Sequence, residues 1–396
     1  MLGAIYIGMS GLSAYSRGIQ TVSDNVVNLN SPGFKANSAG FRDVYSSGGG
    51  GLTFSSPSSE EQFGSGVRFG GGQVDFSQGD LRQSTGDLDL AIQGGGFLIL
   101  KDDGETYYAR TGQFNVDEKG FISLQGTKYH LTVLDQNNNA KALNIDAMRT
   151  SSPLASARVK FSDNLSSSST SASVSNIAVY DSNGGRHVWQ VNFAPVSGVP
   201  GQWNVTVVDD LGATVGGSTL KFIGSIPDPS QAEITISYAP PNADPMSVVL
   251  DFTTGVTSYS AGTTSSLRAA DTDGHGVGAL TNVSIDDEGR VQLIYTNGET
   301  DLVGSVALAD FRDPQKLTRV GAGLYQNTSS GQGRLLASGK EGIGVLLSRQ
   351  LEASNVDLSQ QFGDLILIQR GFQASSQVVS VANDMIQQLF GIRGQG

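Results

Sequence analysis

The side chains best able to bind a metal or move a proton are scattered along this chain. It has 3 histidines, His130, His187 and His275, and 0 cysteines. A zinc site needs several histidine, cysteine or carboxylate ligands at short, regular spacings, and the separation of these histidines does not give one. Without cysteine there is no disulfide bond and no thiol catalysis. We expect ordinary strand or surface histidines, no metal and no cofactor.

One segment is similar to a calcium-binding loop. In DTDGHGVGALTN (271–282), Asp271, Asp273 and Gly276 stand at suitable positions. However, His275 stands where an oxygen ligand is needed, and Asn282 replaces the glutamate that would bind the ion with both oxygens. The segment therefore predicts a turn.

The remaining acidic and glycine clusters also fit turns better than catalysis. The runs 286–288 (DDE) and 117–119 (DEK) each precede a glycine between strand-like segments, which is typical of hairpin tips. QGGGF (93–97) lacks the lysine and hydroxyl residue of a phosphate-binding loop and predicts a strand bend. No catalytic motif surrounds any serine. The sequence therefore gives no indication of an enzyme.

Composition excludes further classes. The 396 residues have room for two or three domains, and their net charge of −12 argues against nucleic acid and anionic membrane surfaces as partners. No apolar run approaches the ~20 residues that span a bilayer. The first residues contain no lysine or arginine before Arg17 and no clear cleavage site, so they make a poor secretory signal peptide.

Both ends of the chain carry helical patterns. Apolar or small residues recur at alternating steps of three and four, which predicts two helices that pair as a coiled coil. The N-terminal seam comprises Ile5, Gly8, Leu12, Tyr15, Ile19, Val22, Val26 and Leu29. The C-terminal seam comprises Ile368, Phe372, Ser375, Val379, Ala382, Ile386 and Leu389, and its apolar stripe continues upstream through Leu358, Phe362 and Leu365.

The faces outside these seams are polar but carry few charges, which suits burial against other protein. Gly8, Gly11 and Gly18 each cost a helix about 1 kcal/mol relative to alanine. We therefore expect ends that are loose in the isolated chain and fold on assembly. The alternative is an ordinary helix pair that closes a globular domain.

Between the ends the pattern is β. Short strand-like runs such as WNVTVV (203–208) alternate with turn clusters such as YDSNGG (180–185). Serine- and threonine-rich stretches at 162–175 and 253–267 bracket a middle block. We expect a mainly β, multidomain chain with discontinuous domains. The proposed order is a terminal helical domain (1–30 and 358–396), an extended linker (31–72), a β domain (73–147 and 278–357) and an inserted outer β domain (148–277).

Several motifs, in order, resemble those of the bacterial flagellar rod and hook proteins. SGLSAYSRGIQTVSDNVVNLNSPGFK (10–35) is similar to their N-terminal signature, and LEASNVDLSQQFGDLILIQRGFQASSQVVSVANDMIQQL (351–389) to their C-terminal one. GDLDLAIQGGGFLIL (86–100) and YYARTGQFNVDEKGFI (107–122) match further motifs. The residues that carry the terminal motifs are Asn28, Asn30, Pro32, Gly33, Phe34, Lys35, Glu352, Ala353, Ser354, Asn355, Val356 and Asp357.

The large insertion at 148–277 is more similar to the hook members of that family than to its rod members, which are usually shorter. The stretch 44–67 is instead similar to an insertion of the distal rod member, which leaves rod-like behaviour as an alternative. A secreted β-rich adhesin or fibre protein is a third interpretation of the serine-rich middle.

The resemblance implies a structural subunit that polymerises with itself into an open helical tube, with terminal helices inside and β domains outside. As a hook subunit it would serve as a universal joint that transmits motor torque to the filament. Implied partners are the distal rod, hook cap and hook–filament junction proteins and the flagellar export apparatus, with no nucleic acid and no membrane insertion. The implied location is the extracellular flagellum, reached without a cleavable signal peptide.

Overall fold

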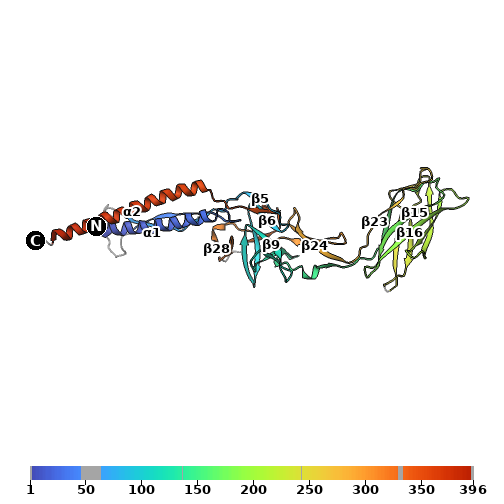
Figure 1. Cartoon of the computed structure of the whole chain (residues 1–396), viewed down its shortest axis with the longest axis horizontal. Coiled ribbons are helices and arrows are strands. Elements are labelled where there is room, and N and C mark those ends of the chain that lie inside the picture. The colour runs from blue at the N-terminus through green and yellow to red at the C-terminus, as the bar shows by residue number, and fades with distance from the viewer. Residues whose placement is uncertain (1, 46–63, 136, 242, 329–332, 394–396) are drawn as a thin grey trace, which may run out of the picture. The chain divides into compact units, whose positions relative to one another are not determined.

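A computed structural model describes residues 2–45, 64–135, 137–241, 243–328 and 333–393. The chain divides into two compact units: residues 1–146, 283–292 and 302–396 form unit 1, and residues 147–282 and 293–301 form unit 2. The prediction of a mainly β chain whose terminal helices pair is confirmed (Figure 1).

The terminal helices belong to unit 1. They are α1 (Leu2–Val27) and α2 (Leu358–Arg393), which lie side by side as the blue and red ribbons of Figure 1. The chain leaves α1 at Asn28, whose side-chain amide donates to the Asp24 carbonyl, and Gly33 then turns it with φ of 70°. Asp357 begins α2, because its Oδ1 accepts the backbone N–H groups of Ser359 and Gln360.

The β part of unit 1 is built around an antiparallel sheet in the order β28-β29-β8-β7-β11-β10-β9-β6-β31, with β12, β27 and β30 attached at its side. Smaller pairs are β1 with β4, β2 with β3, and β5 with β32. The strands are β1 (Asn37–Ser38), β2 (Phe41–Tyr45), β3 (Gly64–Phe69), β4 (Gln73–Val74), β5 (Leu81–Gln83), β6 (Asp89–Gln93), β7 (Phe97–Asp102), β8 (Glu105–Ala109), β9 (Thr111–Val116), β10 (Ile122–Leu124), β11 (His130–Leu134), β12 (Ala140–Ala142), β27 (Leu308–Asp310), β28 (Leu317–Gly321), β29 (Leu324–Asn327), β30 (Arg334–Leu336), β31 (Val345–Ser348) and β32 (Gln350–Glu352).

Aromatic side chains fill the core beneath this sheet. Phe97 and Tyr325 pack edge to face with centroids 6.0 Å apart, and Phe76 packs against both rings. Such contacts bury large apolar areas in a fixed geometry. These rings belong to one buried apolar cluster of unit 1.

Unit 2 contains two sheets that share one core. Their orders are β15-β16-β17-β18-β19 and β20-β21-β14-β22, with β23 paired to β14. The strands are β13 (Thr150–Ser151), β14 (Arg158–Asn164), β15 (Ala172–Tyr180), β16 (Arg186–Pro195), β17 (Gln202–Val208), β18 (Thr214–Ile223), β19 (Ile226–Pro227), β20 (Glu233–Tyr238), β21 (Met246–Asp251), β22 (Val256–Thr257) and β23 (Arg268–Thr272). The division between the units falls within β24 (Gly278–Ile285), β25 (Arg290–Tyr295) and β26 (Thr300–Ser305).

Alternating side chains build the core of unit 2. Trp203, Val205 and Val207 of β17 and Ile234 and Ile236 of β20 are buried and alternate with more exposed residues, as expected for strands with one face against a core. Trp189, Phe161 and Phe252 are fully buried, and the rings of the two phenylalanines stack with centroids 4.5 Å apart. Both tryptophans of the chain, Trp189 and Trp203, lie in this core.

The segments tested for chemistry have structural roles. Asp117 and Asp286 each accept two backbone N–H groups on Oδ1 at a hairpin tip. In the calcium-like segment, Asp273 accepts the N–H groups of Ala157 and Arg158. In the described part of the chain, no group of three or more histidine, cysteine or acidic side chains is placed to hold a metal ion.

The histidines likewise have protein partners. His130 stacks on Phe121 with centroids 4.4 Å apart, the Nε2 atom of His187 lies 2.9 Å from the Asp181 carboxylate, and His275 pairs its backbone with that of Leu154. Within the described ranges, neither α1 nor α2 combines the length and apolar character required to cross a membrane.

Unit 2 should lose stability in acid. Burial by itself would raise the pKa of Asp251, but hydrogen bonds from Thr253 and from Arg158 outweigh it and hold that pKa below the usual value. Asp251 therefore stabilises the fold fully above its unfolded pKa of about 3.9, and this stabilisation is lost as pH falls through the lower folded pKa.

We expect urea unfolding of the whole chain, followed by tryptophan fluorescence, to show constant stability from neutral pH down to about pH 5 and a fall below about pH 4. Asp251→Asn should lower stability at neutral pH and flatten that fall. The exposed Asp210→Asn serves as the matched control and should keep the wild-type profile. An Asp251→Asn profile parallel to wild type would contradict this role.

Candidate assembly surface and its buried anchor

The helix pair packs through small residues. Gly8, Gly11, Ala14 and Gly18 are buried along one line of α1. A Cβ atom added at Gly8 would lie 2.6 Å from Val379, and one added at Gly11 would overlap Ser375. The glycines that weaken α1 in isolation thus allow its backbone to approach α2 closely.

The residues of the predicted N-terminal seam are all at least partly covered in the single chain. Val22 is buried, and Ile5, Leu12, Tyr15, Ile19, Val26 and Leu29 are partly buried. On α2, Ile368 and Ala382 are buried, and Leu365, Ser375, Val379 and Ile386 are partly buried. The side chain of Leu389 lies outside the described residues.

Three residues of the predicted C-terminal stripe are not covered by α1. Leu358, Phe362 and Phe372 are 38%, 51% and 37% exposed. Gly371, and not Phe372, lies against the Tyr15 ring of α1. A Cβ atom added at Gly371 would lie only 2.5 Å from that ring. The large ring of α1 requires a glycine opposite it on α2.

A polar contact replaces the expected apolar one near Phe362. Gln361 is buried and accepts a hydrogen bond of 2.8 Å from the buried Asn25 side chain. The amide of Asn25 also exchanges hydrogen bonds with both backbone groups of Asn37. A search for apolar periodicity misses such a pair, although a buried amide fixes helix register by penalising any shift.

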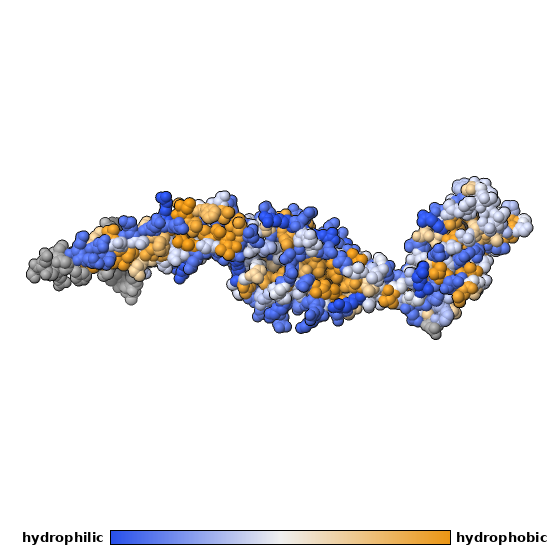
Figure 2. Space-filling model, in the orientation of Figure 1, coloured by the Kyte–Doolittle hydropathy of each residue, from blue (hydrophilic) through white to orange (hydrophobic). Residues whose placement is uncertain are grey.

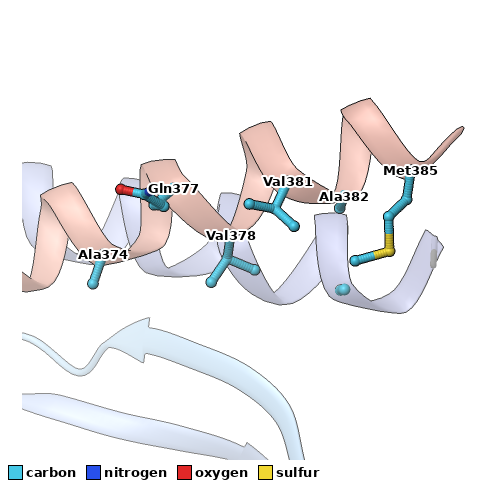
Figure 3. A pocket seen from close by; sticks show the side chains of 7 residues that line it. Ala374, Gln377, Val378, Val381, Ala382 and Met385 are labelled. Carbon is cyan, nitrogen blue, oxygen red and sulfur yellow. The ribbon is translucent and has the colours of Figure 1, made fainter. Parts of the chain in front are cut away.

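Apolar side chains remain exposed on the faces that the helix pair does not cover. Figure 2 shows orange, hydrophobic residues gathered along the helices. On α2 they are Leu358, Phe362, Ile366, Leu367, Phe372, Val378, Val381 and Met385, and on α1 they are Tyr6, Ile7, Met9 and Val27. Several of them border a shallow apolar groove beside Ala4 and Ala374 (Figure 3). An exposed apolar surface of this extent is typical of a site that binds another protein.

A buried cluster of charges ties the two chain ends to the sheet. The Nζ atom of Lys35 lies 2.6 Å from Glu352 Oε1, and Nε of Arg110 lies 3.3 Å from Glu352 Oε2. The side chains of Lys35, Arg110 and Glu352 are 0%, 4% and 0% exposed. One carboxylate therefore joins a lysine of the N-terminal segment to an arginine between β8 and β9 of the large sheet.

Backbone groups complete this cluster. Lys35 donates to the Ser77 carbonyl at 2.6 Å, and the N–H of Gly79 donates to Glu352. Arg110 donates to the carbonyls of Gly94 and Gly96, so it holds the bend of the QGGGF segment. Burial lowers the pKa of Lys35 from its usual value because the ammonium loses its hydration, and the Glu352 carboxylate offsets this only in part.

The other motif residues surround the cluster. The N–H of Gly33 donates to the Glu352 carbonyl at 2.7 Å, and the N–H of Ala36 donates to Asn355 Oδ1 at 2.8 Å. Phe34 and Val356 are buried, Asn28 and Asp357 cap the helix ends, Ala353 and Ser354 are partly buried, and Asn30 and Pro32 are exposed. Arg110, Asn25 and Gln361 were not singled out from the sequence, because a lone polar residue in a strand or helix carries no spacing signal.

Loss of the shared carboxylate should unfold unit 1 more easily. Glu352→Gln leaves Lys35 and Arg110 buried without a counter-charge, and we expect it to cost about 3–5 kcal/mol. Denaturant unfolding followed by helical circular dichroism measures this cost, while tryptophan fluorescence reports unit 2 and should not change. Glu341→Gln, at an exposed carboxylate, should change stability by no more than about 0.5 kcal/mol. Equal effects of the two variants would contradict the anchor role.

The glycines of α2 should respond oppositely to alanine. At Gly363 an added Cβ meets nothing within 4 Å, so Gly363→Ala should stabilise the helix by up to about 1 kcal/mol. Gly371→Ala pushes a methyl group into Tyr15 and should destabilise by about 1–3 kcal/mol. Thermal melts followed by helical circular dichroism compare the two. A stabilising Gly371→Ala would show that the helices do not approach in this register.

Comparison with known proteins agrees with this arrangement. Residues 5–35 match the family described as "Flagella basal body rod protein", residues 144–275 match "Flagellar basal body protein FlaE D2 domain", and residues 347–392 match "Flagellar basal body rod FlgEFG protein C-terminal". The two terminal matches contain the helices and the motifs around the buried cluster.

Similar proteins align along nearly the whole chain. The flagellar hook protein FlgE of Treponema pallidum is 27% identical over 99% of this chain and 100% of its own length. That of Escherichia coli is 28% identical over 97% and 98%. The crystal structure of Helicobacter pylori hook protein FlgE2 resembles the fold with a TM-score of 0.51 at 13% identity, over 69% of this chain and 100% of that one. Rod-type matches at both ends, a D2-domain match between them and full-length similarity to hook proteins show that this chain belongs to the family of bacterial flagellar rod and hook proteins.

Proposed function

We propose that this chain is a structural subunit of the flagellar hook and polymerises with itself into a helical tube. The observation that carries this proposal is the apolar surface left on the helix pair. Phe362 is 51% exposed and Leu367 is 69% exposed, although α1 and α2 already cover each other's seams. A surface that one chain cannot bury is satisfied when copies of the chain pack together.

The contact between copies is head to tail. A heterologous contact that does not close on itself gives an open helical polymer. The exposed faces of α1 and α2 flank their shared seam, so each helix pair offers apolar surface to neighbours on more than one side. The terminal helical domain (1–30 and 358–396) then forms the inner wall, with the β domains outside it.

The inner helices and the outer β domains have different mechanical roles. Burial of each apolar side chain between helices contributes roughly 1.5–3 kcal/mol, which gives a continuous axial connection. The inserted β domain (148–277) contributes weaker, polar contacts that slide as the tube turns. The polymer thus acts as a universal joint that passes motor torque to the filament while bending. The D2-domain match at 144–275 favours the hook over the distal rod.

The remaining assignments follow from this role. The subunit meets the distal rod at one end of the tube, the hook cap during growth and the hook–filament junction proteins at the other end. It reaches the extracellular part of the flagellum through the flagellar export apparatus, without cleavage of a signal peptide. The stretch 46–63, which bears on rod-like behaviour, lies outside the described residues. The family is structural, and the chain is not an enzyme.

Polymerisation should depend on the exposed face of α2. Phe362→Ser together with Ile366→Ser removes apolar area that is already half exposed in the single chain, so monomer stability should change by less than about 1 kcal/mol. The same change removes burial between copies. We expect electron microscopy to show no tubes from the double variant under conditions in which the wild type forms them.

The matched control is Gln369→Ser together with Gln373→Ser, at exposed polar positions of α2, which should assemble normally. Deletion of residues 358–389 should leave a folded β core that stays monomeric. Normal tubes from the Phe362/Ile366 variant or from the truncation would exclude this assembly mode.

A further inference from the structure

The turn between β17 and β18 of unit 2 carries a leucine that the single chain does not cover. Leu211 is 89% exposed, a larger fraction than for any other large hydrophobic side chain in the described part of the chain. Its turn is fixed, because Asp209 Oδ1 accepts the backbone N–H groups of Leu211 and Ala213, and Gly212 follows with φ of 80°. Leu211 therefore forms an apolar projection on a rigid turn, which we call the knob.

Other hairpin tips show that this kind of turn does not require a leucine. Tips of the same construction begin at Asp117, Asp181 and Asp286. In each, the aspartate Oδ1 accepts the N–H groups two and four residues further on, and the third residue is a glycine with positive φ. The residues before those glycines are Lys119, Asn183 and Glu288. All three are polar and exposed, so the turn itself does not account for Leu211.

A hollow of about 370 Å³ lies at the opposite end of β17, where the loop between β16 and β17 forms most of its wall. Its apolar lining residues are Pro195, Val196, Val199, Pro200 and Trp203. Val199 is 43% exposed, whereas Trp203 is 2% exposed and forms part of the core below. The hollow is thus an apolar depression that is open to solvent.

The knob and the hollow cannot meet within one chain. β17 comprises 7 residues, and at about 3.3 Å per residue its two ends lie about 23 Å apart. Leu211 can enter such a hollow only in a second copy whose β17 continues the line of the first.

The charges beside the knob and the hollow are opposite in sign. Asp210, which is exposed, directly precedes Leu211. Lys221, also exposed, pairs in register with Gln202, a lining residue of the hollow. Asp228 also lies near Lys221, but its carboxylate accepts hydrogen bonds of its own. A copy that brings its knob to the hollow of another therefore brings a carboxylate to an ammonium group.

We propose that Leu211 of one copy docks in the hollow beside Trp203 of the next copy, with Asp210 facing Lys221. The two surfaces differ, so the contact is heterologous and lines up successive copies of unit 2 instead of closing a dimer. This inference rests on the proposed function only because the tube supplies the aligned neighbours.

The contact is weak by itself. Stable interfaces bury at least about 1,200 Å², and one leucine with the rim of its hollow buries much less. In a tube, the helix contacts hold neighbouring copies at a high effective concentration, so that a weak contact forms. Because it depends on one side chain, it also releases and re-forms as neighbouring copies slide.

Cross-linking tests this contact. The chain has 0 cysteines, so Ser197→Cys beside the hollow and Ala213→Cys beside the knob introduce the only thiols. Both positions are exposed, and Leu211 and the lining residues of the hollow stay unchanged. We expect a short bismaleimide to join the double variant in tubes into a ladder of covalent oligomers on a denaturing gel. The two thiols of one chain lie at opposite ends of β17, so the reagent can join them only between copies.

Substitutions in this double-cysteine chain identify the groups responsible. Leu211→Asn introduces the side chain found at the Asp181 tip and should lower the yield of the ladder about tenfold or more, with an unchanged melting temperature. Leu154→Asn, at a leucine of unit 2 that is 53% exposed, is the matched control and should keep the ladder. Lys221→Asp should weaken the ladder, and Asp210→Lys added to it should restore the yield. A ladder that survives Leu211→Asn would overturn the docking, and a failed charge exchange would overturn the Asp210–Lys221 pairing.

The same reaction on the concentrated soluble chain separates this inference from the proposed function. If wild-type chains form no tubes but the soluble chain gives a ladder that depends on Leu211, the proposed hook function fails and the contact stands. If tubes form and no ladder appears in them, the hook function stands and the docking is overturned. If neither tubes nor a ladder appear, both fail.

Discussion

One buried carboxylate holds the architecture of unit 1 together. Glu352 accepts from Lys35 and Arg110 and, through its backbone carbonyl, from Gly33. Burying these charges is costly by itself, so the arrangement persists only because each charge finds several partners. A shift of either chain end by one residue would leave a charge without partners. The cluster therefore fixes where α1 ends and where α2 begins relative to the sheet.

Steric fit then fixes how α1 and α2 align with each other. Gly8, Gly11 and Gly371 allow the two helices to approach closely in only one register. The buried Asn25–Gln361 hydrogen bond would be lost if the helices shifted to a neighbouring register. Since these devices use small and polar residues along the seam, they leave Phe362, Leu367 and Met385 on the outer faces. The same choices that make the pair unique also provide the surface for other copies.

Periodicity predicted much of this fold. The steps of three and four located both helices, and strand alternation with turn residues located the β middle. A hydrophobic pattern ranks Phe362 and Phe372 above Gln361 and Gly371, although the last two are the residues that contact α1. Lys35 and Glu352 were marked only through family resemblance. Their pairing, and the role of Arg110, depend on contacts between distant segments that spacing does not encode.

The distance along the chain between Lys35 and Glu352 also sets the order of folding. These residues are 317 positions apart, and closing a loop of that length costs about 5 kcal/mol in entropy. Unit 2, formed largely by the continuous stretch 147–282, closes its contacts over shorter loops. A chain that emerges N-terminus first therefore completes unit 2 early, while unit 1 waits for its last segment. Until then the subunit has no finished helix pair with which to engage a neighbour, so premature association is suppressed.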